Sequence, residues 1–152
     1  MISLPKTIRW DSGELFILNQ TKLPQEVIEE KQDSIEQVWD SIKQLKVRGA
    51  PAIGVAGAYG LLLGIRDKKT LGVKEFLKEI QNKAAFLESS RPTAVNLRWA
   101  LDRMINLIIK SPKEKLVEIM YNEASLILEE DINFCKKIGE HGLKLIENIS
   151  KE

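Results

Sequence analysis

Two arginines in this sequence stand directly in front of expected helix starts, a placement that suits the binding of a phosphate group. One lies in Arg48-Gly49-Ala50-Pro51 and the other in Ser90-Arg91-Pro92-Thr93. A helix amino terminus offers unpaired N–H groups and the positive end of the helix dipole. Gly49 would let an anion approach the main chain, while a guanidinium supplies a planar pair of donors. Two such loops in one small domain predict a convergent phosphate or phosphosugar site.

Each loop taken singly has a second interpretation. A solvated arginine beside a capped helix would give the same pattern, and the hydroxyls of Ser90 and Thr93 could either cap the helix or donate to a ligand. Arginine stays protonated at neutral pH, so Arg48 and Arg91 are suited to bind and orient a substrate but not to shuttle a proton.

The other reactive residue types give weaker signals. His141 is the only histidine, so no second imidazole could share a metal with it, and we expect a surface or capping position. Cys135 falls on an apolar helix stripe and is predicted to lie in the core. The acidic run 129–131 is most simply a solvated helix face, and Glu123 supports no hypothesis. We therefore predict no catalytic residue and no metal site among these residues.

The run that follows Arg48 contains four glycines inside one expected helix. Each glycine costs about 1 kcal/mol relative to alanine in a helix interior, so something must offset it. Close helix packing in the core would explain Gly57, Gly60 and Gly64. Gly54, one turn into the helix, is the only one predicted to lie near a bound anion.

The elements that must position these residues follow from hydrophobic periodicity. Alternation predicts a hairpin with strands over 7–10 and 14–18, and a second extended piece over 26–30. From Ser34, which can cap a helix, the period changes to that of helices. We expect helices over 35–45, from Pro51 to about 65, over about 73–87, over about 94–109, and a long one from Ser111-Pro112 to beyond Gly142 with one possible break near Gly139.

Length and composition predict one mostly helical α+β domain over residues 1–152, with a small antiparallel β-region over 1–31. The chain has 152 residues, of which 43% are hydrophobic and 30% charged, and its net charge is +1. That charge offers no electrostatic case for nucleic acid or a membrane surface. The longest apolar run, 50–65, is shorter than the roughly 20 residues that span a bilayer. The first ten residues show no export signal, so we expect a cytoplasmic location.

Four motifs in order resemble a known family over nearly the whole chain. They are RWDSGELFILNQTKLP, VRGAPAIGVAGAYG, SRPTAVNLRWALDRM and EEDINFCKKIGEHGLKLI, and they are similar to the amino-terminal half of methylthioribose-1-phosphate isomerase, an enzyme of methionine salvage. The wider family includes ribose-1,5-bisphosphate isomerase and the regulatory subunits of a translation-initiation nucleotide-exchange factor. Trp99, in NLRWALDRM, favours the methylthioribose branch.

The resemblance implies a cofactor-independent aldose–ketose isomerisation of 5-methylthioribose 1-phosphate to 5-methylthioribulose 1-phosphate. Arg48, Gly49 and Ala50 match the family's substrate-binding RGA segment, and Arg91 matches its second substrate arginine. These are the positions that the helix-start argument reaches independently. The resemblance also implies a homodimer.

The departure from the family lies in the segments that carry its chemistry. Family members have a Rossmann-like second domain with a THCNAG-type segment, which holds the catalytic cysteine, and a later catalytic aspartate. No segment here matches them, and Cys135 is not that cysteine. We therefore expect the amino-terminal domain of such an isomerase, inactive alone. A non-catalytic regulatory binding protein related to the exchange-factor subunits and a ribose-1,5-bisphosphate isomerase remain alternatives.

Overall fold

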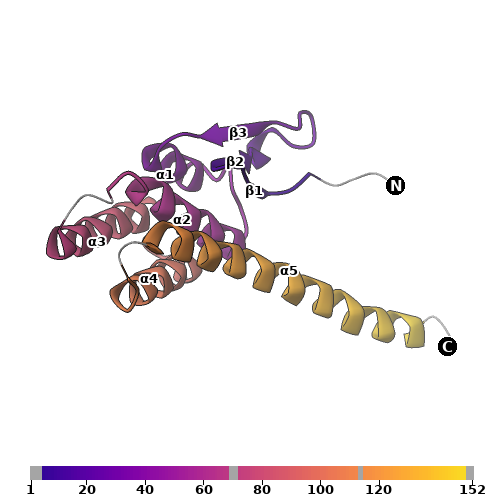
Figure 1. Ribbon diagram of the computed structural model, residues 1–152. Coiled ribbons are helices and arrows are strands. Elements are labelled where there is room, and N and C mark those ends of the chain that lie inside the picture. Colours follow the sequence, from indigo (N-terminus) through magenta and orange to yellow (C-terminus); the bar gives the residue numbers. More distant parts are fainter. Residues whose placement is uncertain (1–4, 69–71, 113–114, 150–152) are drawn as a thin grey trace.

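A computed structural model describes residues 5–68, 72–112 and 115–149 of the chain. Residues 1–4 lie outside the described residues, so the structure does not bear on the expected lack of an export signal there. Residues 113–114, which follow the predicted helix start at Ser111-Pro112, also lie outside the described residues. The described part contains a small sheet and five α-helices, with α2 lying between the sheet and the other long helices (Figure 1). The prediction of a mainly helical α+β fold with a small antiparallel sheet is confirmed.

The sheet has three antiparallel strands in the order β1-β2-β3, namely β1 (Ile8–Asp11), β2 (Glu14–Leu18) and β3 (Glu29–Gln32). The predicted hairpin forms at Ser12 and Gly13, whose φ angles of 50° and 88° suit the tight turn of a two-residue connection. Leu15 and Ile17 are buried, as the alternation predicts. A single 3-10 turn, η1 (Gln20–Lys22), follows β2.

The third strand lies three residues later than the sequence predicts. The expected piece begins at Glu26, but the strand begins at Glu29, and Val27 is exposed. Strand β3 consists of Glu, Glu, Lys and Gln, so it has no apolar alternation to reveal it. It is held by pairing with β2 and by Gln32, which is buried and accepts a hydrogen bond from the Ser41 hydroxyl at 3.0 Å.

The first two helices start as predicted. In α1 (Ile35–Lys43) the Ser34 hydroxyl accepts from the N–H of Gln37, and the helix ends two residues before the predicted Leu45, which has a φ of 57°. The second helix, α2 (Ala50–Ile65), is apolar on every face and buried along most of its length, as expected of a central helix. It contacts β1 and all four other α-helices.

Three glycines of α2 let neighbouring side chains approach closely, which confirms the packing explanation. A Cβ on Gly57 would lie 2.4 Å from Leu97 Cδ1, a Cβ on Gly60 2.7 Å from Val38, and a Cβ on Gly64 2.8 Å from Ile35. Those neighbours come from α1 and α4, so the glycines set the distance of both helices from α2. The burial that close packing allows offsets the cost of glycine in the helix.

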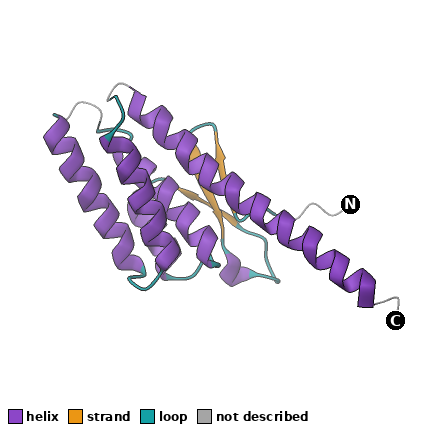
Figure 2. Ribbon diagram, turned by 90° about the horizontal axis from the view of Figure 1, so that it is seen from below, coloured by secondary structure: helices purple, strands orange, loops and turns teal. Residues whose placement is uncertain are grey.

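The remaining helices are α3 (Val73–Ser90), α4 (Val95–Ile109) and α5 (Leu116–Ile149). Helix α5 is continuous through Gly139, so the possible break predicted there does not occur. Its second half extends beyond the other elements in both views (Figures 1 and 2). Cys135 is exposed, so its predicted core position is wrong. The apolar stripe of α5 continues past Ile127, the last buried residue among those described on this helix. None of the helices formed by the described residues has the length and apolar character that crossing a bilayer requires.

Candidate functional site

The starts of α2 and α4 open onto one cavity of about 570 Å³. The structure brings together there the four residues that the sequence singled out, Arg48, Gly49 and Ala50 before and at the start of α2, and Arg91 before α4. The cavity is lined by Leu45, Arg48, Gly49, Ala50, Ile53, Arg91, Thr93, Ala94, Val95 and Asn96. Two cationic side chains therefore border the same space as two helix amino termini.

Neither helix start is occupied by a capping side chain from the described part of the chain. Gly49 is the residue before α2, with a φ of 90°, and no described atom lies within 4 Å of where its Cβ would be. This conformation favours glycine, and the open space allows a ligand to reach the main chain. Ala94 precedes α4, and its methyl side chain cannot accept a hydrogen bond from the helix N–H groups. Backbone N–H groups at both starts are left to bind an anion.

The two arginines are held differently. Arg48 is exposed, and its Nε donates to the carbonyl oxygen of Leu45 at 3.2 Å, which leaves its two terminal nitrogens for a ligand. Arg91 is half-buried at the end of α3, and among the described residues its side chain has no hydrogen-bond or ion-pair partner. A phosphate placed between them would receive donors from both side chains and from the helix starts.

Two expectations about this region are wrong. The Ser90 hydroxyl does not cap α4 or face a ligand, because Ser90 is buried and donates to the carbonyl oxygen of Leu87 at 2.6 Å. Gly54, which the sequence predicts to lie near an anion, is not among the residues that line this cavity. A Cβ there would be 2.8 Å from the carbonyl oxygen of Asn96, so this glycine lets the first turn of α4 pack against α2.

A second cavity, smaller and mainly apolar, adjoins the first. It has a volume of about 270 Å³ and lies between the first turns of α2, the start of α4 and the middle of α5. Asn96 lines both cavities, and the consecutive residues Ala50 and Pro51 line one each. The residues lining the second cavity are Pro51, Val55, Asn96, Trp99, Ile127, Glu130, Asp131, Phe134, Cys135 and Ile138.

A network of charges joins α4 to α5 beside this second cavity. Arg103 donates to both carboxylate oxygens of Glu130, at 2.6 and 3.0 Å, and its Nε donates to Glu123. The hydrogen bond from Arg103 lowers the pKa of the Glu130 carboxyl, and the same bond raises the pKa of Arg103. Glu130 is therefore not the simple solvated residue that the sequence predicts, and Glu123 has a structural role that sequence reasoning missed. The i, i+7 spacing of the two carboxylates on α5 is visible in the sequence, but it does not show that Arg103 of α4 faces them.

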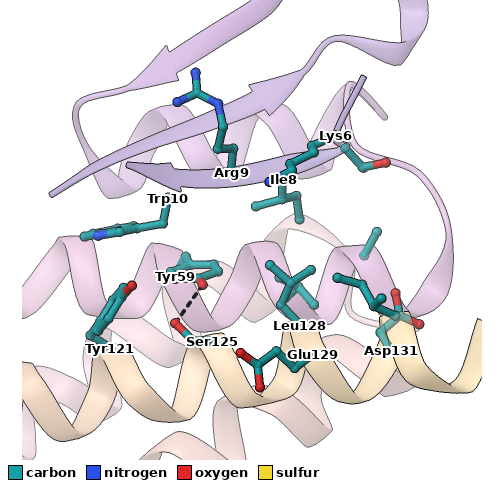
Figure 3. A pocket seen from close by; sticks show the side chains of 14 residues that line it. Lys6, Ile8, Arg9, Trp10, Tyr59, Tyr121, Ser125, Leu128, Glu129 and Asp131 are labelled. Carbon is teal, nitrogen blue, oxygen red and sulfur yellow. Dashed lines mark hydrogen bonds between the residues drawn. The ribbon is translucent and has the colours of Figure 1, made fainter. Parts of the chain in front are cut away.

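A third cavity lies between β1, α2 and α5, away from the predicted site residues (Figure 3). It has a volume of about 420 Å³. The Trp10 ring stacks on Tyr59 with 5.3 Å between ring centroids, and the Tyr59 hydroxyl lies 3.1 Å from that of Ser125. Burial raises the pKa of Tyr59. Two basic residues and two acidic residues also line this cavity, namely Lys6, Arg9, Glu129 and Asp131, so it has no dominant charge.

No cluster of histidine, cysteine, aspartate and glutamate among the described residues could hold a metal ion. His141 is exposed on α5, in agreement with its predicted surface position. The Sγ of Cys135 donates to the Asp131 carboxylate at 4.0 Å. The expectations of no metal and no cofactor stay predictions.

The comparisons with known proteins all point to one family. Residues 46–150 match the Initiation factor 2 subunit family. Among curated proteins, the chain is 44% identical over 142 residues to the 5-deoxyribose 1-phosphate isomerase of Moorella thermoacetica, covering 91% of this chain and 40% of that protein. It is 43% identical over 150 residues to the methylthioribose-1-phosphate isomerase of Bacillus cereus, covering 97% and 42%.

Two solved structures share the fold. The 5-methylthioribose 1-phosphate isomerase of Pyrococcus horikoshii OT3 is similar with a TM-score of 0.77 and 37% identity, covering 84% of this chain and 36% of that one. The translation initiation factor eIF-2B subunit delta of A. fulgidus is similar with a TM-score of 0.76 and 39% identity, covering 83% and 37%. The chain thus spans about 40% of the length of the curated relatives described above.

Proposed function

The chain belongs to the Initiation factor 2 subunit family, and we propose that it supplies the phosphosugar-binding part of an isomerase acting on 5-methylthioribose 1-phosphate. The observation that carries the proposal is the convergence of two uncapped helix starts and two arginines on one cavity. The substrate-binding residues are Arg48, Gly49, Ala50 and Arg91. In this assignment the C1 phosphate lies between the two guanidinium groups.

Holding the phosphate would serve the chemistry by orienting the sugar. The C1 of the substrate is masked as a glycosyl phosphate, so the ring must open before hydrogen can move between C2 and C1. Ring opening requires a general acid, and the transfer requires a base or a sheltered path for hydride. Binding energy from the phosphate, which does not itself react, would position the sugar for both steps.

The described residues that line the phosphate cavity provide binding but no proton transfer. They include two arginines and no carboxylate, imidazole, thiol or lysine. Arginine remains charged at neutral pH and neither gives nor takes a proton there. We therefore propose that this chain binds the phosphosugar without converting it, and that the acid and base of the isomerisation come from other groups.

One comparison favours a second candidate function. The structural similarity to the initiation-factor subunit delta is nearly equal to that with the isomerase, at TM-scores of 0.76 and 0.77. A non-catalytic regulatory protein that keeps the same pocket for a sugar phosphate or a nucleotide would share the fold. Isomerase activity in a protein that contains this chain would decide for the enzyme.

Two further properties are part of the proposal. We propose that the assembled isomerase is a homodimer, as the resemblance implies, and that it is cytoplasmic. Apolar side chains exposed on the outer half of α5 provide a surface for contacts with further protein; they include Ile138, Leu145, Ile146 and Ile149.

A calorimetric comparison tests the phosphate site. We expect 5-methylthioribose 1-phosphate to bind the purified chain, while 5-methylthioribose without the phosphate binds at least about tenfold more weakly, because hydrogen bonds between charged groups are lost. Inorganic phosphate should compete. Equal affinities for the two sugars, in a sample shown to be folded by circular dichroism, would contradict a site built around the phosphate.

A further inference from the structure

The cavity between β1, α2 and α5 lies apart from the proposed phosphate site and shares no lining residue with it. Its volume of about 420 Å³ falls in the range of roughly 300–1,000 Å³ that is usual for small-molecule sites. Figure 3 shows two unlike ends, with the rings of Trp10, Tyr59 and Tyr121 at one and Lys6 and Asp131 at the other. A ligand that fits both ends must be apolar at one end and charged at the other.

The apolar end is an aromatic wall that is already fixed. The Trp10 ring is nearly parallel to that of Tyr59, at 15° and 5.3 Å, and is tilted by 47° to that of Tyr121 at 6.0 Å. Tyr59 is buried, and its hydroxyl lies 3.1 Å from that of Ser125 on α5. Tyr121 is partly exposed, so the wall has an open side that an apolar or aromatic group can cover.

Arg9 lines this cavity but is not available to a ligand there. Its guanidinium donates to Asp11 at 2.9 Å and to Glu29 at 3.0 Å, and it lies 4.1 Å from the centroid of the Phe16 ring. Successive side chains of a strand point to opposite faces, and Figure 3 shows the guanidinium on the face of β1 turned away from α5. The charges free to bind a ligand therefore come from other residues.

Those residues are Lys6, Glu129 and Asp131. Among the described residues none of the three forms an ion pair, and the contact of the Asp131 carboxylate with Cys135 is long, at 4.0 Å. Lys6 and Glu129 are exposed and Asp131 is half-buried, so all three can meet a ligand that enters from solvent. The cavity thus offers one free ammonium and two free carboxylates beside an aromatic wall.

This mixture of charges disfavours a ligand that has only one. A simple amine would be attracted by the carboxylates and repelled by Lys6, and a simple carboxylic acid would meet both Glu129 and Asp131 with no ammonium of its own. A ligand with both charges gains a charge-assisted hydrogen bond from each kind of group. The inner residues of a peptide carry neither backbone charge, so a free amino acid fits better than a peptide segment.

We propose that this cavity binds a free α-amino acid with an apolar or aromatic side chain. The carboxylate of the amino acid pairs with Lys6, its ammonium pairs with Asp131 and Glu129, and its side chain lies against Trp10 and Tyr121. The site goes beyond the proposed function, because no group of the sugar phosphate is bound there.

Three small molecules test the proposal on the purified chain by titration calorimetry. L-Phenylalanine should bind saturably with a Kd of about 1 mM or lower. 2-Phenylethylamine, which lacks the carboxylate, and 3-phenylpropionate, which lacks the ammonium, should each bind at least about fivefold more weakly. An analogue with a single charge that binds as tightly as phenylalanine would overturn the assignment to an amino acid.

Two charge-removing variants locate the contacts. Lys6→Met should reduce the preference for phenylalanine over 2-phenylethylamine to less than about twofold, and Glu129→Gln should lower the preference over 3-phenylpropionate. The matched controls Lys22→Met and Glu140→Gln remove the same charges from exposed positions that do not line the cavity, and both should keep the full preferences. Controls that lose the preferences equally would contradict the assigned contacts.

A spectroscopic readout on the unchanged chain places the ligand. In NMR spectra the indole N–H resonance of Trp10, assigned with Trp10→Phe, should shift with phenylalanine, while the amide of Gly49 at the phosphate cavity should hardly move. An unshifted Trp10 indole at saturation would overturn the site. Binding of phenylalanine to a chain that does not bind 5-methylthioribose 1-phosphate would contradict the proposed function alone and leave this site standing.

Discussion

Replacing Arg48 by alanine is expected to weaken the binding of 5-methylthioribose 1-phosphate to the chain about tenfold to a hundredfold, the range for a hydrogen bond to a charged group. Arg48 lines the cavity at the start of α2, and within the described part of the chain its side chain makes one hydrogen bond, to the carbonyl oxygen of Leu45. The substitution thus removes a ligand contact while disturbing little of the fold. Titration calorimetry measures the loss.

The matched control for this variant is Arg98→Ala. Arg98 lies on α4, is highly exposed and pairs with Glu88 at 3.5 Å, but it lines neither of the two adjoining cavities. Arg98→Ala removes the same charge from the same region, so a general electrostatic effect would weaken sugar phosphate binding in both variants. An Arg48→Ala chain that binds as tightly as the unchanged one would rule out a role for this guanidinium in holding phosphate.

Substitution of Gly54 by alanine should destabilise the chain by about 1 kcal/mol or more, as overpacking of a core does. The new Cβ would lie 2.8 Å from the carbonyl oxygen and 3.3 Å from the carbonyl carbon of Asn96. A backbone cannot turn aside as the end of a side chain can, so the first turn of α4 must move. Asn96 lines both adjoining cavities, so affinity for the sugar phosphate should fall as well.

Gly139→Ala provides the opposite case within the same chain. Gly139 lies in the exposed outer half of α5, where a Cβ would meet no described atom within 4 Å. Alanine there should stabilise the helix by up to about 1 kcal/mol. Urea unfolding, monitored by circular dichroism, measures the change in the free energy of unfolding for both the Gly54→Ala and the Gly139→Ala variant. A Gly54→Ala variant as stable as the unchanged chain would show that α2 and α4 are not in close contact at that point.

Much of the fold is predictable because its periodic signals are strong. The stripes of α1, α3 and α4 and the hairpin at Ser12-Gly13 follow from local spacing alone. Gly57, Gly60 and Gly64 are explained by packing as predicted, although the partners Leu97, Val38 and Ile35 come from distant positions that a single sequence does not reveal.

The predictions that are wrong or missing concern residues whose structure is determined by tertiary contacts. Strand β3 has a polar sequence and exists because β2 offers it a partner. Cys135 shares the apolar spacing of buried residues, yet it is exposed, as are most of the described residues of α5 after Ile127. The ion pairs of Arg103 with Glu123 and Glu130 depend on how α4 and α5 face each other.

The candidate site likewise has one part that can be predicted from the sequence and one part that cannot. Arg48, Gly49, Ala50 and Arg91 could be selected from sequence because their chemistry is local: each arginine stands just before a helix start. The apolar cavity could not, since it needs three helices brought together around Asn96. The sequence pointed to Gly54 as an anion contact, whereas the structure assigns it to the packing that places Asn96 there.

A single NMR titration tests the central claim, which is that this chain binds the sugar phosphate at the starts of α2 and α4 without isomerising it. One sample of labelled protein with 5-methylthioribose 1-phosphate reports on both molecules at once. We predict saturable shifts at the amides of Gly49 and Ala50 and an unchanged aldose spectrum. Absence of those shifts in a folded sample would contradict the binding site, and ketose signals would contradict the claim that the chain only binds.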